Sequence, residues 1–391
     1  MRQTAVNKLH IFMVMFLISL VMSIQSPIFT PYAAKLGASS VLIGIMLSIA
    51  SFTNLTGNLI AGPLSDRFGK KVFIIISLFL SGILFIFHAL VSSTMNLFVL
   101  RALNGFSLAF LVPSGLALLS GYAKNSHQQG KNMAINGILG TSASIIAPLI
   151  GGKLGATIGY ANTYLIIGGS LILTAIYATS FIKETQHTVV VKGNQSNRLS
   201  FLNILQMPQL QVVFVTGFAL MYIHGVIIYE VPYLTVEKGL STATTGQLFS
   251  FMGIGTFLSL SLLFINRFNP IKRIMFGLFG MNMVVFIILQ GLLSLPVSLF
   301  LVGFFFGIIM PAIATALTDS VSNNGYGRAF GVMSAIYSLG MITSSFITGV
   351  IRDFISPYFI AFTIGMLALT LIGYSRFQTK TSSPFQAPIE Y

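Results

Sequence analysis

The sequence contains no cysteine and no tryptophan, and only 7 of its 391 residues are acidic. Without cysteine the chain can form neither a disulfide framework nor a thiolate metal site. So few carboxylates leave little material for hydrolytic or metal-dependent chemistry, and we expect no enzyme, no metal site and no cofactor. Charged residues make up 7% of the chain, against about 25% in a soluble domain. A water-exposed surface cannot be built from so few charges, which excludes a soluble globular protein.

Apolar residues in long runs are what the sequence has in abundance. They make up 55% of the chain and recur from end to end, separated by short polar breaks. A helix needs about 20 such residues to cross a bilayer, whereas the strands of a transmembrane β-barrel would alternate in polarity. The first run, 11–24, lacks a cleavage site and is interpreted as a permanent span. The sequence predicts an all-α integral membrane protein with twelve transmembrane helices, at 9–33, 41–62, 72–93, 95–121, 131–151, 161–182, 210–233, 243–265, 274–294, 296–319, 329–351 and 358–376.

A polar segment at 183–209 divides the predicted spans into two sets of six. We expect a first half at 1–182, a cytoplasmic linker at 183–209, a second half at 210–376 and a cytoplasmic tail at 377–391. Internal repeats of this kind are typical of transporters that bind their substrate between the repeats. Three short matches lie at nearly one offset between the halves: Asp66-Arg67-Phe68 with Asn266-Arg267-Phe268, Gly105 and Pro113 with Gly303 and Pro311, and Gly130-Lys131 with Gly327-Arg328.

The basic residues predict how the helices are oriented. If both termini lie in the cytoplasm, 16 of the 21 lysines and arginines lie on the cytoplasmic side, 4 lie outside, and Arg101 falls within a span. This imbalance follows the positive-inside rule, so the net charge of +14 reflects membrane topology and we expect no nucleic-acid partner. The compact loops and the lack of eukaryotic targeting signals favour a bacterial plasma membrane.

The predicted turn between the second and third helices has a distinctive sequence, Gly62-Pro63-Leu64-Ser65-Asp66-Arg67-Phe68-Gly69-Lys70-Lys71. Its glycines permit tight backbone turns, and Asp66 can accept charge-assisted hydrogen bonds from a helix N-terminus or a basic residue. The segment resembles the Gly-x-Leu-x-Asp-Arg-x-Gly-Arg-Lys motif of the major facilitator superfamily. Together with twelve spans and duplicated halves, the resemblance covers essentially the whole chain. It implies a secondary transporter whose halves rock about a central cavity.

We interpret this turn as a conformational latch on the cytoplasmic side. A carboxylate that holds a helix terminus in one state and releases it in the other would bias the two conformations. The alternative is that Arg67 and the two lysines after it only set the topology and contact anionic lipids. The latch candidates are Gly62, Asp66, Arg67 and Gly69, with Asp319 and Arg328 in the second half.

The fourth helix contains Arg101-x-x-x-Gly105-x-x-x-Ala109. This segment is similar to a motif of the superfamily whose arginine is associated with proton coupling. An arginine within a span usually faces the bundle interior or a water-filled cavity. Since Arg101 lies only about 9 Å into the helix, snorkelling to the outer interface is the alternative.

The fifth helix reads Ala143-Ser144-Ile145-Ile146-Ala147-Pro148-Leu149-Ile150-Gly151-Gly152. It is similar to the Gly-Pro-x-x-Gly-Gly ending found in the drug and metabolite exporters of the superfamily, with alanine in place of two glycines. Proline kinks a helix, and small residues allow neighbouring helices to approach closely. The segment therefore predicts a hinge, and plain helix packing is the alternative. The hinge residues are Ala143, Ala147, Pro148, Gly151 and Gly152.

The seventh helix carries Glu230, which is the carboxylate expected within or near a span on the outer half. We take Glu230, Arg101, Asp66 and His224 as candidates for proton coupling. For Glu230 the alternative is a solvated carboxylate, and for His224 it is a buried neutral histidine. Asp353 is expected at the outer surface.

Polar side chains within the spans predict where a cavity lies. Such a side chain finds no partner in lipid, so it should point toward the interior of the bundle. For any single residue, a hydrogen bond between helices is the alternative to contact with a substrate. The cavity candidates are Gln25, Asn54, Asn58, Asn104, Asn136, Tyr222 and Tyr229.

These features predict proton-coupled export of small amphipathic molecules by alternating access, by a protein that acts as a monomer. The expected partners are a small-molecule substrate, protons and membrane lipids. No P-loop sequence is present, so direct coupling to ATP within the chain is not expected. The alternatives are a uniporter or proton-coupled importer of a sugar or small metabolite, a lipid translocase, and, from another class, a channel or sensor.

Overall fold

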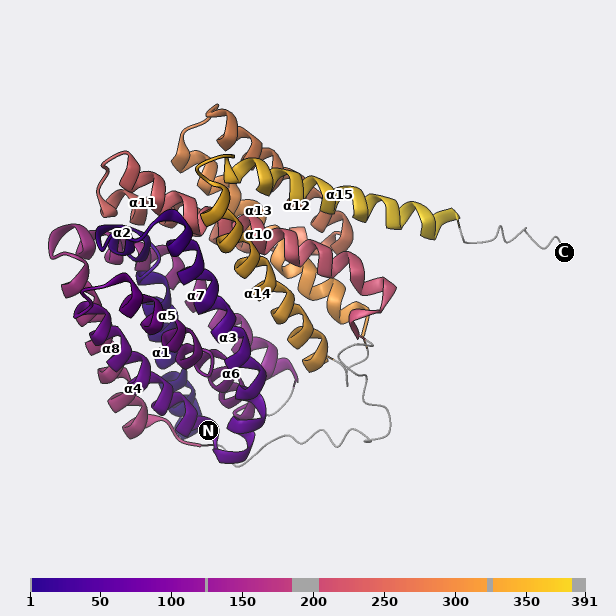
Figure 1. Cartoon of the computed structure of the whole chain (residues 1–391). Coiled ribbons are helices and arrows are strands. Elements are labelled where there is room, and N and C mark those ends of the chain that lie inside the picture. The colour runs from indigo at the N-terminus through magenta and orange to yellow at the C-terminus, as the bar shows by residue number, and fades with distance from the viewer. Residues whose placement is uncertain (1, 124–125, 185–203, 322–325, 382–391) are drawn as a thin grey trace.

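The computed structural model describes residues 2–123, 126–184, 204–321 and 326–381, and this part of the chain is built from helices without any strand (Figure 1). The first group of helices comprises α1 (Arg2–Ile24), α2 (Phe29–Lys35), α3 (Ser40–Phe68), α4 (Lys70–Ala89), α5 (Thr94–Leu108), α6 (Leu111–Gly121), α7 (Ser126–Thr157) and α8 (Tyr160–Phe181). The second group comprises α10 (Pro208–Glu237), α11 (Thr242–Ser261), the short 3-10 helix η2 (Leu263–Arg267), α12 (Pro270–Gln290), α13 (Leu295–Asp319), α14 (Tyr326–Ile351) and α15 (Pro357–Thr381).

Eleven helical stretches of the described chain are long and apolar enough to cross a membrane, with α5 and α6 counted together. The predicted span at 243–265 is the exception. Its helix, α11, opens with the polar sequence Thr-Ala-Thr-Thr-Gly-Gln, which lowers its hydropathy. The helix packs between α7 and α13, where Ser250 Oγ donates to the Ile145 carbonyl at 2.6 Å and Thr256 Oγ1 donates to the Gly303 carbonyl at 3.0 Å.

Two of the predicted helices are interrupted. The single helix expected at 9–33 is instead α1 followed by α2, and the break falls where Pro27 has no N–H to donate. The helix expected at 95–121 is α5 followed by α6. Pro113 lies in the first turn of α6, so the Ala109 carbonyl receives no helical hydrogen bond from it.

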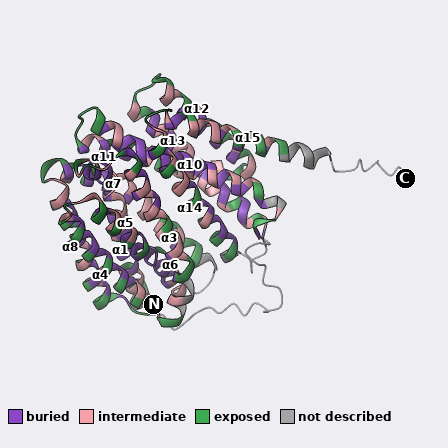
Figure 2. Cartoon of the chain, viewed as in Figure 1, coloured by how far each residue is buried: buried purple, intermediate pink, exposed green. Residues whose placement is uncertain are grey.

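Each group has its own apolar core. One cluster of buried side chains is drawn from residues 11–182 together with Tyr229, and the other from residues 204–372. Buried residues lie on the faces between helices and exposed ones on the outer faces (Figure 2). Many exposed side chains are large and apolar, such as Leu173 and Phe276, as a surface against lipid tails requires. Of the predicted linker and tail, residues 185–203 and 382–391 lie outside the described chain.

The two groups meet where α3 crosses α14 and where α7 crosses α11. A Cβ atom on Gly44 would lie only 2.5 Å from the Ser345 carbonyl oxygen, and one on Gly152 would lie 2.6 Å from the Thr242 carbonyl oxygen. Only glycine permits so close an approach of two backbones. We call the end of the bundle at the α14–α15 turn the Arg352 end, and the opposite end, at the α3–α4 turn, the Gly69 end.

Hydrogen bonds reinforce these crossings. Among the described residues, those that join the two groups lie from the middle of the bundle to the Arg352 end. They are Ser40 Oγ to Asp353 Oδ2 (3.0 Å), Tyr229 Oη to the Ser40 carbonyl (2.6 Å), Ser48 Oγ to the Ile342 carbonyl (2.9 Å), Tyr160 Oη with Thr242 Oγ1 (3.1 Å) and the Ser250 bond given above.

Glu184, just after α8, caps the N-terminus of α4. Its Oε2 accepts a hydrogen bond from the Lys71 amide at 2.7 Å and its Oε1 one from the Lys70 amide at 3.3 Å. Gly69 joins α3 to α4 at φ +98°, a backbone conformation that suits glycine. A carboxylate at a helix N-terminus meets unpaired N–H groups and the positive end of the helix dipole, so the contact ties the end of the first group to this turn.

Glu184→Gln should therefore lower the stability of the protein by up to about 1 kcal/mol, because a neutral amide loses the attraction to the helix terminus. Glu184→Ala should cost more, since both hydrogen bonds are lost. Thermal unfolding of the purified protein in detergent measures the two shifts, and Lys183→Ala, which removes the neighbouring exposed side chain, is the control. Equal stability of wild type and Glu184→Ala would show that the cap contributes nothing.

Candidate functional site

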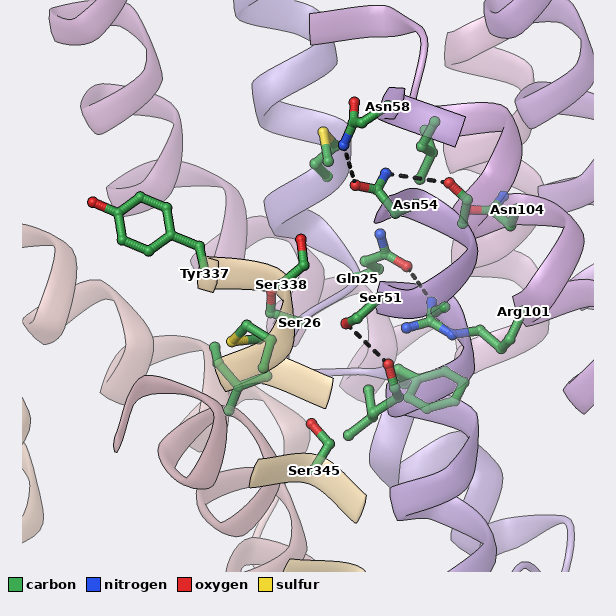
Figure 3. Close-up of a pocket in the computed structure, with 18 of the residues that line it drawn as sticks. Gln25, Ser26, Ser51, Asn54, Asn58, Arg101, Asn104, Tyr337, Ser338 and Ser345 are labelled. Atoms are coloured by element: carbon green, nitrogen blue, oxygen red, sulfur yellow. Dashed lines mark hydrogen bonds between the residues drawn. The ribbon is translucent and has the colours of Figure 1, made fainter. Parts of the chain in front are cut away.

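A cavity of about 380 Å³ lies between the two groups (Figure 3). A second cavity of about 310 Å³ shares the lining residues Ser26 and Ile228 with it, so the two lie side by side. We call them the Arg101 lobe and the His224 lobe. The polar lining of the Arg101 lobe consists of Gln25, Ser26, Thr30, Ser51, Asn54, Asn58, Arg101 and Asn104 from the first group and of Ser334, Tyr337, Ser338 and Ser345 from the second.

Arg101 extends from α5 into the first lobe. Its Nη1 donates to Gln25 Oε1 at 2.6 Å, and its guanidinium lies over the Phe29 ring at 3.9 Å from the centroid. The break between α1 and α2 brings Gln25 and Phe29 to this position. The residue is only 8% exposed, and its Nε has no hydrogen-bond partner among the described residues. Arg101 thus faces the bundle interior rather than the outer interface.

Three asparagines line the same lobe. Asn58 Nδ2 donates to Asn54 Oδ1 at 2.9 Å, and Asn54 Nδ2 donates to the Gly105 carbonyl at 3.2 Å. Asn104 is buried, and its Nδ2 has no hydrogen-bond partner among the described residues. Gly105 makes this arrangement possible because a Cβ there would collide with the Ala50 carbonyl of α3. Of the seven predicted cavity residues, Gln25 and these asparagines line the lobe.

The other three predicted cavity residues lie elsewhere. Tyr222 is buried in the core of the second group, where it packs against Phe218. The hydroxyl of Tyr229 is taken up by the Ser40 carbonyl at the contact between the groups. Asn136 is half-buried on α7 and is not among the residues that line either lobe. For Tyr229 the structure shows the alternative, a hydrogen bond between helices, and for Tyr222 and Asn136 contact with a substrate stays a prediction.

The contribution of α14 to the cavity was not expected from the sequence. Ser334, Tyr337, Ser338, Met341 and Ser345 all line the Arg101 lobe. Counted from Ser334, they stand at positions i, i+3, i+4, i+7 and i+11, which places them along one face of a helix. That spacing was a usable signal for a polar face in an otherwise apolar span.

The His224 lobe contains two other residues singled out in the sequence. His224 lies 5.2 Å from the Phe306 ring between centroids, and its Nδ1 is buried with no hydrogen-bond partner in the described chain. Pro148 lines the same lobe. The glycines that follow it are contact points, since a Cβ on Gly151 would collide with the Ile24 carbonyl and Gly152 lies against α11. Ala143 and Ala147 are fully buried. The hinge stays a prediction.

Glu230 lies outside both lobes, in a buried ion cluster at the Arg352 end. Arg352 Nε donates to Glu230 Oε1 at 3.1 Å, and its Nη1 donates to Glu237 Oε1 at 3.0 Å. Asp353 Oδ1 lies 3.4 Å from the same Nη1, and the guanidinium covers the Tyr233 ring at 3.6 Å from the centroid. We call these five residues the Arg352 cluster. The cationic partner of Glu230 is therefore Arg352 and not Arg101.

The electrostatics of the cluster favour a charged arginine. Burial lowers the pKa of Arg352, but hydrogen bonding and charge from Glu237 and Glu230 outweigh it, so the pKa lies above its ordinary value. Asp353, whose side chain is 59% exposed, also accepts the hydrogen bond from Ser40 Oγ of α3. The cluster thus links the second group to the first at the Arg352 end.

The predicted latch lies near the Gly69 end. Arg67 is exposed and packs over Phe68, at 5.2 Å from the ring centroid. The side chains of Gly62 and Asp66 lie outside the described residues. Asp319 ends α13, and Arg328 is exposed in the first turn of α14. The latch therefore stays a prediction, and among the described side chains Glu184 brings a carboxylate to this turn.

The family model described as Major Facilitator Superfamily matches residues 11–345. The chain is 25% identical to the multidrug resistance protein MdtG of Rahnella sp. (strain Y9602), over 96% of this chain and 93% of that protein. It is 26% identical to the multi-drug resistance efflux pump PmrA homolog of Lactococcus lactis subsp. lactis (strain IL1403), over 85% of each.

Solved structures share the fold. The nucleoside transporter NupG superposes with a TM-score of 0.70 at 13% identity, over 97% of this chain and 100% of that one. A bacterial homolog of the human lysosomal transporter Spinster, in an inward-facing and unoccupied conformation, gives a TM-score of 0.72 at 17% identity, over 96% and 93% of the two chains.

Arg352→Gln should destabilise the protein by about 3 to 5 kcal/mol, because it leaves the Glu230 carboxylate buried without its cation. Adding Glu230→Gln to that variant should recover part of the loss. Reversible unfolding in mixed detergent micelles measures both variants and the double variant. Glu237→Gln is the matched control and should cost less than about 1 kcal/mol, since that carboxylate is exposed. Strictly additive losses would show that Arg352 and Glu230 do not act as a pair.

Proposed function

The chain belongs to the major facilitator superfamily, so it is a membrane transporter and not an enzyme, and we propose that it exports small amphipathic molecules from the cytoplasm in exchange for protons. The observation that carries the proposal is the cavity between the two helix groups, lined by polar and apolar side chains from both. The names of the relatives, multidrug resistance protein and efflux pump, support export.

The basic residues support an orientation with the Gly69 end in the cytoplasm and twelve helices across the plasma membrane. In this orientation α11 crosses the membrane together with the eleven apolar stretches, and its polar residues are accommodated by contact with α7 and α13. The contacts between the groups then lie toward the outer side. The cavity is closed from outside, as a transporter that loads its substrate from the cytoplasm requires.

Alternating access follows from the contacts that close the outer side. To open there, α3 must part from α14 and α7 from α11, and the hydrogen bond from Ser40 to Asp353 must break. These are backbone contacts at glycines and a few hydroxyl bonds, among them the bond from the buried Tyr229 to the Ser40 carbonyl. Such a contact can be broken and remade in each cycle.

Glu230 is the proton site that we favour among the four candidates. It is buried beside the outer contact, and protonation would remove one of the carboxylates that hold Arg352. Because Asp353 binds both Arg352 and Ser40, a change in the charge of the cluster reaches the contact between the groups. A proton from the outer medium would thereby alter the balance between the two conformations.

Glu230→Gln should uncouple proton movement from substrate transport. Proteoliposomes are prepared with an acidic lumen, the membrane potential is clamped at zero, and two permanently charged probes are supplied, naphthalenesulfonate and naphthylmethyl-trimethylammonium. Wild type should accumulate one of them while protons leave, and Glu230→Gln should lose this proton efflux by about tenfold or more. Glu237→Gln, on the same helix and the same arginine, should behave as wild type.

The alternatives give different results in the same vesicles. Uptake that is indifferent to the pH gradient would mean a uniporter. Accumulation that requires an alkaline lumen would mean proton-coupled import. Unchanged proton efflux in Glu230→Gln would remove Glu230 from the coupling role and leave Asp66, Arg101 and His224 as candidates.

Gly44→Leu should hold the outer side open, because a side chain there collides with the backbone of Ser345 and Gly349. The absence of native cysteine allows a single reporter, Ser26→Cys, at the junction of the lobes. In whole cells, a membrane-impermeant maleimide should label this reporter several times faster when Gly44→Leu is present. Gly169→Leu, where nothing lies within 4 Å, is the control. Equal labelling in the two backgrounds would show that the α3–α14 crossing does not close the cavity.

A further inference from the structure

Arg101 is the one charged side chain among the residues that line the two lobes, apart from the titratable His224. No carboxylate of the described chain lines either lobe. Glu230, Glu237 and Asp353 surround Arg352, and Glu184 caps α4. Asp319 and Asp66 belong to helix ends, and Glu390 lies outside the described residues. The cavity therefore has a permanent positive charge without a negative partner of its own.

The contacts of Arg101 do not neutralise this charge. Gln25 offers a neutral amide oxygen, and Phe29 offers the face of its ring. A buried arginine is costly unless an anion pairs with it, and removal of water from the guanidinium is only partly offset by neutral acceptors. Arg352, whose side chain is 7% exposed, has three carboxylates within 3.4 Å. The difference indicates that the anion for Arg101 arrives from outside the protein.

A second, independent observation is the kind of polar atom left unpaired beside Arg101. Asn104 Nδ2, one helical turn further along α5, is buried and has no hydrogen-bond partner in the described chain. Like Arg101 Nε, it is a donor. Unpaired donors next to a positive charge complement an oxyanion, whereas a cationic ligand would require carboxylates or carbonyl oxygens.

We propose that the transported molecule is an amphipathic organic anion, whose oxyanion pairs with Arg101 in one lobe while its apolar part extends into the other. This inference rests on the transport function proposed above. Beyond Ser26 and Ile228, which line both lobes, the His224 lobe offers Phe249, Met252 and Phe306. Methionine and phenylalanine form adaptable apolar walls that accept varied ring systems. The planar fork of the guanidinium matches carboxylate, sulfonate and phosphonate groups alike.

Binding of two matched probes to the purified wild-type protein in detergent tests the proposal. Naphthalenesulfonate and naphthylmethyl-trimethylammonium share the ring system and differ in the sign of their permanent charge. Isothermal titration at constant ionic strength should give tighter binding of the sulfonate. Arg101→Gln should weaken sulfonate binding by about tenfold or more while leaving binding of the cation unchanged or stronger. Lys153→Gln, which removes an exposed positive charge remote from the cavity, should change neither.

Arg101→Lys keeps the proposal testable if the neutral variant does not yield folded protein, as judged by size-exclusion chromatography. It retains the charge but loses the planar fork, so sulfonate binding should weaken and the preference for the anion should remain. Tighter binding of the cation by wild type, or equal loss of both probes in Arg101→Gln, would overturn the assignment of an anionic substrate.

The experiments distinguish an error in the proposed anionic substrate from an error in the proposed transport function. Uptake of the cation alone into vesicles of wild-type protein would overturn the anion and support the transport proposal. Arg101-dependent binding of the sulfonate without uptake of either probe would support the anion site and overturn the proposed transport.

Discussion

Direct contact between helix backbones, at the crossings of α3 with α14 and of α7 with α11, is the constraint on which the rest of the structure depends. Lipid tails are as apolar as leucine, so the hydrophobic effect does not drive helices together within a bilayer, and packing of small residues must do so. Gly44 against Gly349 and Gly152 against Gly246 bring the backbones together at these crossings. The cavity remains between the groups where such contacts cease. Close backbone contacts of this kind are also ones that a conformational change can separate.

Arg352 and Arg101 are both largely removed from water, and they differ in the groups that surround their charge. Arg352 is surrounded by carboxylates and by the Tyr233 ring, and through Asp353 it is connected to Ser40 of the other group. Within the described part of the chain, Arg101 has only neutral partners. The cost of removing water from a guanidinium is therefore offset by the protein's own carboxylates at Arg352, whereas at Arg101 it favours binding of an anion from outside the protein. Burial alone does not distinguish the two arginines. The groups that contact each guanidinium decide what it does.

Much of this arrangement could be predicted from the sequence. The features that could not be predicted share one cause. Apolar runs locate the helices because lipid selects for composition. The repeated glycines Gly105 and Gly303 occupy equivalent close contacts, against the carbonyls of Ala50 and Met252. Polarity within a span indicates that a side chain avoids lipid, and Asn54 and Asn104 do lie inside the bundle, where they line the Arg101 lobe. Polarity does not identify the partner, however. Tyr229 hydrogen-bonds to a backbone carbonyl, Glu230 pairs with an arginine 122 residues away, and Glu184 caps a helix 113 residues earlier in the chain, since tertiary packing alone decides these pairings.

The position of the cavity relates substrate binding to the movement of the two groups. The Arg101 lobe is lined by α1, α2, the turn between them, α3 and α5 on one side and by α10 and α14 on the other, so a bound molecule contacts both groups at once. A ligand can shift a conformational equilibrium only by the difference in its affinity for the two states. A molecule that pairs with Arg101 and touches the α14 face gains most when the groups approach each other around it. Substrate binding would thereby lower the cost of bringing the two groups together, which is the step that alternating access requires.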